Sequence, residues 1–146
     1  MATPVKLFDY CEQLAKGVHI WSTHTFKVAL TNTSPAQTNT VLADITQLST
    51  GGGYTGGAGG GLTLDTVTVT ESGTGNHDIV LTIADEVLTA TGTVGPFRYL
   101  FYYNDSATSP ADAGILYYDH ASSVTLANTE TFTADHDATN GLWKLV

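Results

Sequence analysis

The sequence predicts a mostly β protein, a single antiparallel β-sandwich or jelly-roll-like domain over residues 1–146 with one short N-terminal helix. The composition favours strands, because Thr, Val and Tyr are abundant and only 13% of the residues are charged. Apolar and polar residues alternate over short segments that are separated by turn-forming residues. No alternation of strand and helix patterns indicates a parallel sheet. A chain of 146 residues is long enough for one ordinary domain.

The N-terminal segment predicts a helix over residues 4–16. Its apolar side chains recur at helical spacing, at Leu7, Cys11 and Leu14. Suitable residues stand at both ends, with Thr3 as the cap, Pro4 at the first position and Gly17 after the last turn. We expect Cys11 to be a small buried apolar side chain. As the single cysteine it excludes an intrachain disulfide and a Cys-based zinc site.

Beyond this segment the period changes from 3.6 to 2. Residues 26–31 alternate between apolar and polar and predict a half-buried strand. Residues 32–39 contain several turn-formers and predict a chain reversal. Residues 41–48 fit either a short helix or the start of a strand.

The region 62–146 is expected to be β-rich throughout. Its strand-like segments are 64–69, 79–83, 87–91, 97–103, 115–119, 124–126, 131–133 and 142–145. Turns are predicted at 73–76 and 92, and a polar loop at 104–114. Segment 97–103 is apolar on both faces and therefore predicts a central strand, with Phe97, Tyr99, Phe101 and Tyr103 on one face and Leu100 and Tyr102 on the other.

Residues 51–61 form a glycine-rich segment with eight glycines in eleven positions. A phosphate-binding loop would need a Gly-Lys-Ser/Thr ending and a following helix, and neither is present. We expect a mobile or adaptable loop that a partner orders, with Tyr54 as its only large anchor. The candidate interface residues are Gly53, Tyr54, Thr55, Gly56, Trp21 and Trp143.

No arrangement of residues in the sequence predicts catalysis or a cofactor. Gly-x-Ser-x-Gly is absent. Carboxylates in turns commonly bond to local backbone amides, and the acidic residues in or beside predicted turns are Glu86, Asp105, Asp112, Asp119 and Glu130. Asp135 and Asp137 flank His136 and would share one face of a strand, which fits either a cation site or a solvated strand end. The adjacent tyrosines fit either a platform that stacks on sugar rings or core packing with one tyrosine of each pair outward.

Net charge and hydropathy exclude two kinds of partner, nucleic acid and membranes. The formal net charge of −9 opposes binding to nucleic acid. No apolar run approaches the eighteen residues or so of a membrane span, and we expect neither membrane insertion nor a secretory signal.

Several phrases occur in an order that resembles a known group of proteins. These phrases are 26–33, 42–46, 52–57, 95–99, 103–105, 124–126 and 131–133. Over residues of about 20–145 the chain resembles small tailed-bacteriophage virion proteins, in particular head decoration (cement) proteins.

The resemblance implies a β-sandwich or jelly-roll-like module on the exterior of an assembled capsid. It implies binding to the major capsid protein as a dimer or trimer, and stabilisation of the shell in a virion assembled in the host cytoplasm. Two other functions fit the same residues: a tail or fibre component of the virion, and a glycan-binding β-sandwich that uses tyrosines, Trp21 and Trp143.

Overall fold

The computed structural model describes residues 3–72, 78–139 and 141–145. It confirms a mostly β protein with antiparallel sheets and one short helix, in a sandwich-like arrangement. The largest sheet has the strand order β1-β8-β7-β2-β3. Its strands are β1 (Val5–Lys6), β8 (Ala111–Leu126), β7 (Val94–Thr108), β2 (Phe26–Thr31) and β3 (Leu62–Thr63). Among the described residues, no helix has the length and apolar character needed to cross a bilayer.

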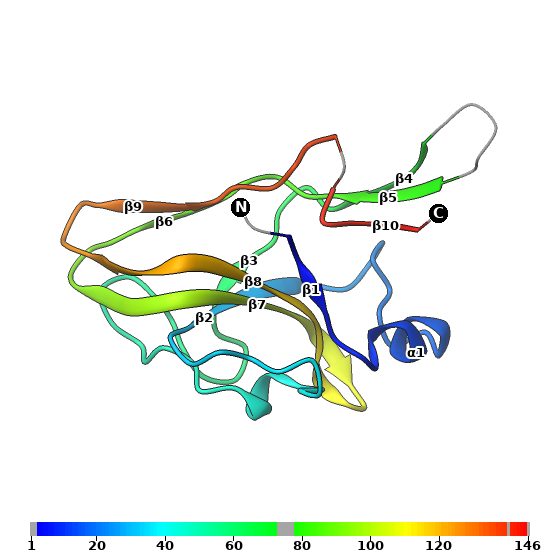
Figure 1. Ribbon diagram of the computed structural model, residues 1–146, viewed down its shortest axis with the longest axis horizontal. Coiled ribbons are helices and arrows are strands. Elements are labelled where there is room, and N and C mark those ends of the chain that lie inside the picture. The colour runs from blue at the N-terminus through cyan, green and yellow to red at the C-terminus, as the bar shows by residue number, and fades with distance from the viewer. Residues whose placement is uncertain (1–2, 73–77, 140, 146) are drawn as a thin grey trace.

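Two smaller sheets form a second layer along one face of the large sheet (Figure 1). One contains β10 (Trp143–Leu145), β5 (Asp78–Thr82) and β4 (Thr68–Ser72) in that order, and the other pairs β6 (Glu86–Thr89) with β9 (Thr131–Ala134). The cyan to green segment 32–61 runs along the opposite side of the large sheet (Figure 1). The large sheet is therefore covered on both faces.

The main hydrophobic core lies between the two sheet layers. Phe97, Leu100 and Tyr102 on β7 face Leu88 and Phe132 on β6 and β9, and all five are buried. The rings of Phe97 and Phe132 meet edge to face with centroids 4.9 Å apart. Such a pair adds about 0.5–1.5 kcal/mol beyond the area that it buries.

A second, smaller core lies on the outer face of the large sheet, beneath segment 32–61. It consists of Leu7, Ala29, Leu42, Phe101 and Tyr103. Because this segment covers the outer face, β2 is buried on both faces, and the prediction of a half-buried strand at 26–31 was wrong. The ambiguous segment 41–48 contains a 3₁₀ helix, η1 (Leu42–Asp44).

The central position of β7 confirms the prediction for segment 97–103, but the predicted division of its faces was partly wrong. Phe97 packs into the main core with Leu100, whereas Phe101 packs into the outer core. The pairing of β7 with β8 shifts register between Val94 and Phe97 and again between Phe97 and Tyr99. An irregularity of this kind changes the face on which later side chains lie.

The polar loop predicted at 104–114 is instead a tight hairpin. Strand β7 continues to Thr108, β8 begins at Ala111, and the Ser109–Pro110 peptide bond between them is cis. Strand β8 runs without a break across the two separate strands predicted at 115–119 and 124–126. Of the strand predicted at 64–69, only residues 68 and 69 are in a strand, β4, and residues 64–67 connect β3 to β4. The turn predicted at 73–76 lies outside the described residues.

The N-terminal helix is shorter than predicted. Only α1 (Tyr10–Ala15) is helical, with Asp9 at its N-cap position, while β1 pairs with β8. The helical spacing at Leu7 has another cause, because Leu7 follows β1 and is buried in the outer core. Cys11 is exposed, contrary to our expectation, and lies 3.3 Å from the Lys6 amine.

Candidate functional site

The glycine-rich segment is a packed layer of the fold, so the prediction of a mobile loop was wrong. A Cβ atom added at Gly56 would lie 2.2 Å from the Leu48 carbonyl oxygen, and one at Gly61 would lie 2.3 Å from that of Val28. No side chain fits at such distances. The glycines are needed because backbone packs directly on backbone here, and no partner is needed to order the segment.

Tyr54 anchors this layer from inside the molecule. Its side chain is 2% exposed, and its hydroxyl oxygen accepts a 2.9 Å hydrogen bond from the Leu30 backbone N–H. Strand β3 pairs only with Lys27 and Val28, so the phenol satisfies a β2 donor beyond the end of β3. The interface role predicted for Tyr54 is therefore wrong, because its surface is already used by the core.

Two further side chains attach the layer to the sheet. The Tyr103 hydroxyl donates to the Gly60 carbonyl oxygen, and the Lys27 amine donates to that of Gly59 at 2.5 Å. The same amine forms an ion pair with Asp105 at 3.0 Å. These contacts hold the segment 51–61 at three neighbouring points.

The outer surface of this layer is uncharged and hollowed. No Asp, Glu, Lys or Arg occurs between positions 44 and 65 of a chain whose net charge is −9. A groove of about 280 Å³ is lined by Leu42, Ala43, Ile45, Gln47, Gly57, Ala58 and Asp112. Of the predicted interface residues, Gly53 and Thr55 are exposed on this layer and Gly56 is half-buried.

Asp112 is the one charged residue that lines the groove. Burial raises the pKa of its carboxyl group, and the nearby Asp105 carboxylate raises it further. The protonated form of Asp112 is therefore favoured relative to that of an exposed carboxyl group.

The two tryptophans lie together, Trp21 in the main core and Trp143 packed against it. Trp21 stacks on Phe26 with ring centroids 3.8 Å apart and meets Trp143 edge to face at 6.4 Å. The Tyr10 ring of α1 meets Trp143 edge to face, with ring centroids 6.1 Å apart. Trp21 is buried and Trp143 is half-buried. This cluster joins α1 to β10, so Trp21 offers little surface to a partner, and an interface role for the half-buried Trp143 stays a prediction.

Tyrosine side chains form no stacking platform on β7. Tyr102 and Tyr103 are both fully buried, contrary to the expectation that one of them points outward. The large sheet is covered on both faces at this point, so neither of these two side chains reaches solvent. Tyr118 is also buried, while Tyr99 and Tyr117 are half-buried.

His136 is part of the interior while its neighbours Asp135 and Asp137 are exposed, as the alternation predicted. The His136 Nδ1–H group donates to the Ala84 carbonyl oxygen at 2.9 Å, so Nε2 accepts the Tyr102 hydroxyl hydrogen at 2.7 Å. Burial lowers the pKa of His136. Within the described ranges no three His, Cys, Asp or Glu side chains are placed to hold a metal ion.

A buried amide connects the segment after α1 to the end of β7. The Asn104 side chain is fully buried, and its Nδ2 group donates to the Val18 carbonyl oxygen and to His24 Nδ1, both at 2.9 Å. A longer contact of 3.4 Å reaches Nδ1 of His19. Burial, together with a smaller effect of the neighbouring His24, lowers the pKa of His19 to about 4.

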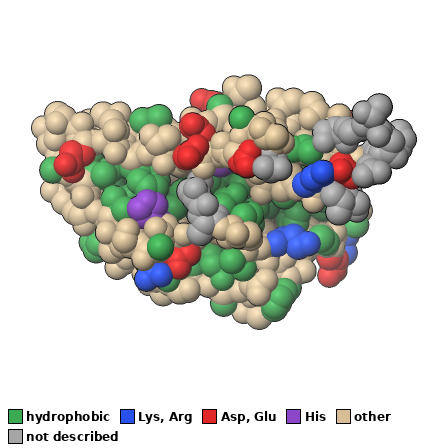
Figure 2. Space-filling model, turned by 45° about the horizontal axis from the view of Figure 1, so that its top comes forward, with side chains coloured by type: hydrophobic (Ala, Val, Ile, Leu, Met, Phe, Trp, Pro, Cys, Tyr) green, Lys and Arg blue, Asp and Glu red, His purple; other side chains and the backbone are tan. Residues whose placement is uncertain are grey.

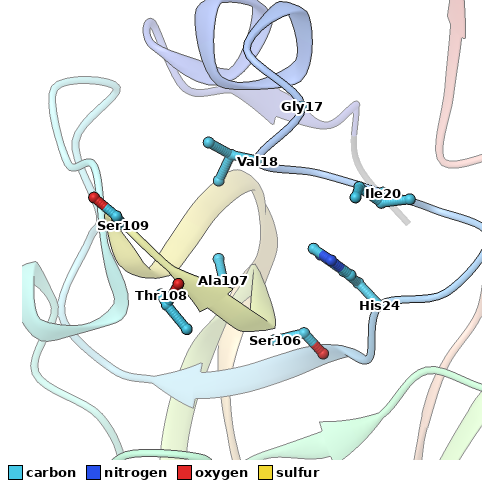
Figure 3. Close-up of a pocket in the computed structure, with 8 residues that line it drawn as sticks. All are labelled: Gly17, Val18, Ile20, His24, Ser106, Ala107, Thr108 and Ser109. Atoms are coloured by element: carbon cyan, nitrogen blue, oxygen red, sulfur yellow. The ribbon is translucent and has the colours of Figure 1, made fainter.

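A pocket of about 320 Å³ lies beside this amide. It is lined by Gly17, Val18, Ile20, His24, Ser106, Ala107, Thr108 and Ser109 (Figure 3). The His24 ring points into the space between Val18, Ile20 and Ala107 (Figure 3). None of the eight lining residues is Asp, Glu, Lys or Arg.

Asn104 and His24 are site residues that sequence patterns do not reveal. Asn104 falls in a segment whose sequence predicts a polar loop, and the two residues are 80 positions apart, so no local pattern connects them. No protein-family model, curated protein or solved structure matches this chain.

Proposed function

We propose that this protein is a non-enzymatic structural protein of a tailed-bacteriophage virion. It decorates the exterior of the assembled capsid, binds the major capsid protein, and stabilises the shell as a dimer or trimer. The proposal builds on the order of sequence phrases described above. The observation that carries it is the rigid, uncharged layer formed by the glycine-rich segment.

This layer has the properties of a protein interface. It is held by Tyr54, Tyr103 and Lys27, so little conformational entropy is lost when a partner covers it. Its surface carries few long side chains, which lets a second backbone approach closely. The absence of charge between positions 44 and 65 lowers the cost of removing water from it.

Other exposed apolar groups support a role in attachment. Figure 2 shows apolar side chains gathered across the middle of one face, with acidic side chains scattered singly around them. Phe8 is 69% exposed. Apolar side chains gathered into one surface patch are typical of proteins that contact other proteins.

The test is co-sedimentation of the purified protein with mature heads that lack it, from the phage that encodes the chain. We expect saturation at a fixed copy number per major capsid protein. Ala58→Glu places a charge at the groove and should weaken binding at least tenfold. Val87→Glu adds the same charge on β6, in the opposite layer, and should bind as the wild type does.

Three outcomes would overturn the proposal. Folded, monodisperse protein that does not bind heads would exclude decoration. Labelled antibody at the tail tip would assign the protein to the tail or a fibre. A change in tryptophan fluorescence on titration with host surface polysaccharide, without head binding, would assign it to glycan binding.

A further inference from the structure

The hydrogen bonds around Asn104 determine where His24 carries its proton. The Ser106 backbone N–H donates to Asn104 Oδ1 at 3.0 Å, which fixes the orientation of the amide. The Nδ2 group must then be the donor toward His24 Nδ1 at 2.9 Å. Nδ1 is an acceptor, so in the neutral ring the hydrogen is on Nε2. His24 therefore presents a fixed N–H donor.

This donor has no partner among the described residues. Of the two ring nitrogens of His24, only Nδ1 has a hydrogen bond there, and the ring points into the pocket beside Val18 and Ala107 (Figure 3). The Phe26 ring lies near the His24 ring, with ring centroids 6.5 Å apart. The pocket thus combines one oriented donor with a small apolar wall, which Val18, Ile20 and Ala107 form.

The shape and charge of the pocket limit the class of ligand. A hydrogen-bond acceptor is needed opposite His24, and a group of about methyl size fits against Val18 and Ala107. A carboxylate would need a positive charge, but no lining residue is Lys or Arg and the chain carries a net charge of −9. A neutral carbonyl that bears a methyl group meets both requirements.

We propose that this pocket binds an acetamido group. The acetamido carbonyl oxygen accepts the hydrogen bond from His24 Nε2–H, and its methyl group packs against Val18 and Ala107. The remainder of the ligand lies along the hydroxyl groups of Ser106, Thr108 and Ser109. A volume of about 320 Å³ is at the lower end of the range for small-molecule sites. This site is independent of the proposed attachment to a capsid.

The test is a titration of isotope-labelled protein followed by NMR. N-acetylglucosamine and N-acetylglycinamide present the same acetamido group on a sugar and on a peptide, and the tighter ligand identifies the source. Two control compounds are used. Glucose lacks the acetamido group, and acetate has the methyl group but carries a negative charge. We expect saturation with a Kd on the order of 1 mM, with shifts at Val18 and Ala107 and little response to either comparison.

Variants separate this site from other surfaces. His24→Ala removes the donor and should weaken binding about five- to tenfold. It leaves the Asn104 amide bonded to the Val18 carbonyl oxygen, so the fold is retained. The control is His120→Ala, since His120 is also half-buried but does not line the pocket.

A second pair of variants does not touch the buried amide. Ile20 is 43% exposed at the pocket, and Ile20→Glu should also weaken binding. Val87→Glu makes the same charge change on β6, away from the pocket, and should leave binding unchanged. Absence of binding at 50 mM (about fifty times the expected Kd), equal binding of acetate, or binding insensitive to both His24→Ala and Ile20→Glu would overturn the proposal.

Discussion

Replacement of Tyr54 by phenylalanine tests whether the glycine-rich segment is part of the folded core. The substitution keeps the ring and removes only the hydroxyl oxygen that accepts the Leu30 N–H at 2.9 Å. The Leu30 donor is fully buried, and no β3 residue pairs with it, since β3 pairs only with Lys27 and Val28. Tyr54→Phe therefore leaves a buried backbone donor without an acceptor.

The expected cost follows from that lost bond. An unsatisfied buried donor costs about 1–3 kcal/mol of unfolding free energy. In a domain of this size each kcal/mol lowers Tm by roughly 2–4 °C. Tyr54→Ala should cost more, about 3–5 kcal/mol, because it also removes the buried ring.

Urea unfolding monitored by tryptophan fluorescence measures this difference. The matched control is Tyr99→Phe, because the Tyr99 hydroxyl makes no hydrogen bond within the described part of the chain, and we expect a change below about 0.5 kcal/mol. Hydrogen exchange at the Leu30 amide should also become faster in Tyr54→Phe alone. Equal stability of the two variants, with unchanged protection of Leu30, would refute the role of the phenol as an acceptor for β2.

Three further predictions concern the core. Deletion of 51–60 should abolish cooperative unfolding, and retention of a cooperative transition would show that the segment is dispensable. Phe101→Ala should cost about 3–5 kcal/mol in urea unfolding, because the ring is fully buried in the outer core; a cost under about 1 kcal/mol would contradict the central position of β7. His19 stays neutral in the folded state down to about pH 4, whereas the unfolded residue binds a proton below about 6.5, so stability should fall as the pH drops through this window. Urea midpoints at several pH values should show a weaker dependence in His19→Gln, and an unchanged slope would exclude His19 as the source.

The mostly β fold could be predicted from the sequence because side-chain patterns report burial directly. The segment 97–103 is apolar on both faces, and only a covered central strand buries both. The alternation at 26–31 gave the correct strand, although it did not show that a second layer covers the outer face. Local pattern therefore identified the strands but not the layers around them.

The errors arose where distant contacts determine local structure. The spacing of Leu7 fits a helix, yet the preceding residues pair with Tyr117 and Leu116 of β8, more than a hundred positions away. Glycine-rich composition usually indicates flexibility because the unfolded chain gains entropy. Here the same composition permits close packing of backbone on backbone, and composition alone does not distinguish the two cases.

The candidate sites were harder to predict than the fold, because their chemistry depends on pairs of residues that the sheets bring together. Trp21 and Trp143 are natural candidates for an interaction surface. Strand β10, however, places Trp143 against Trp21, and their rings contact each other. Asn104 looks like a loop residue until β7 is extended past it, and only then does its amide meet His24. A polar residue next to a predicted strand end can therefore be a solvated loop residue or a buried residue of a longer strand. It contributes to a site only in the second case, which depends on how far the strand continues.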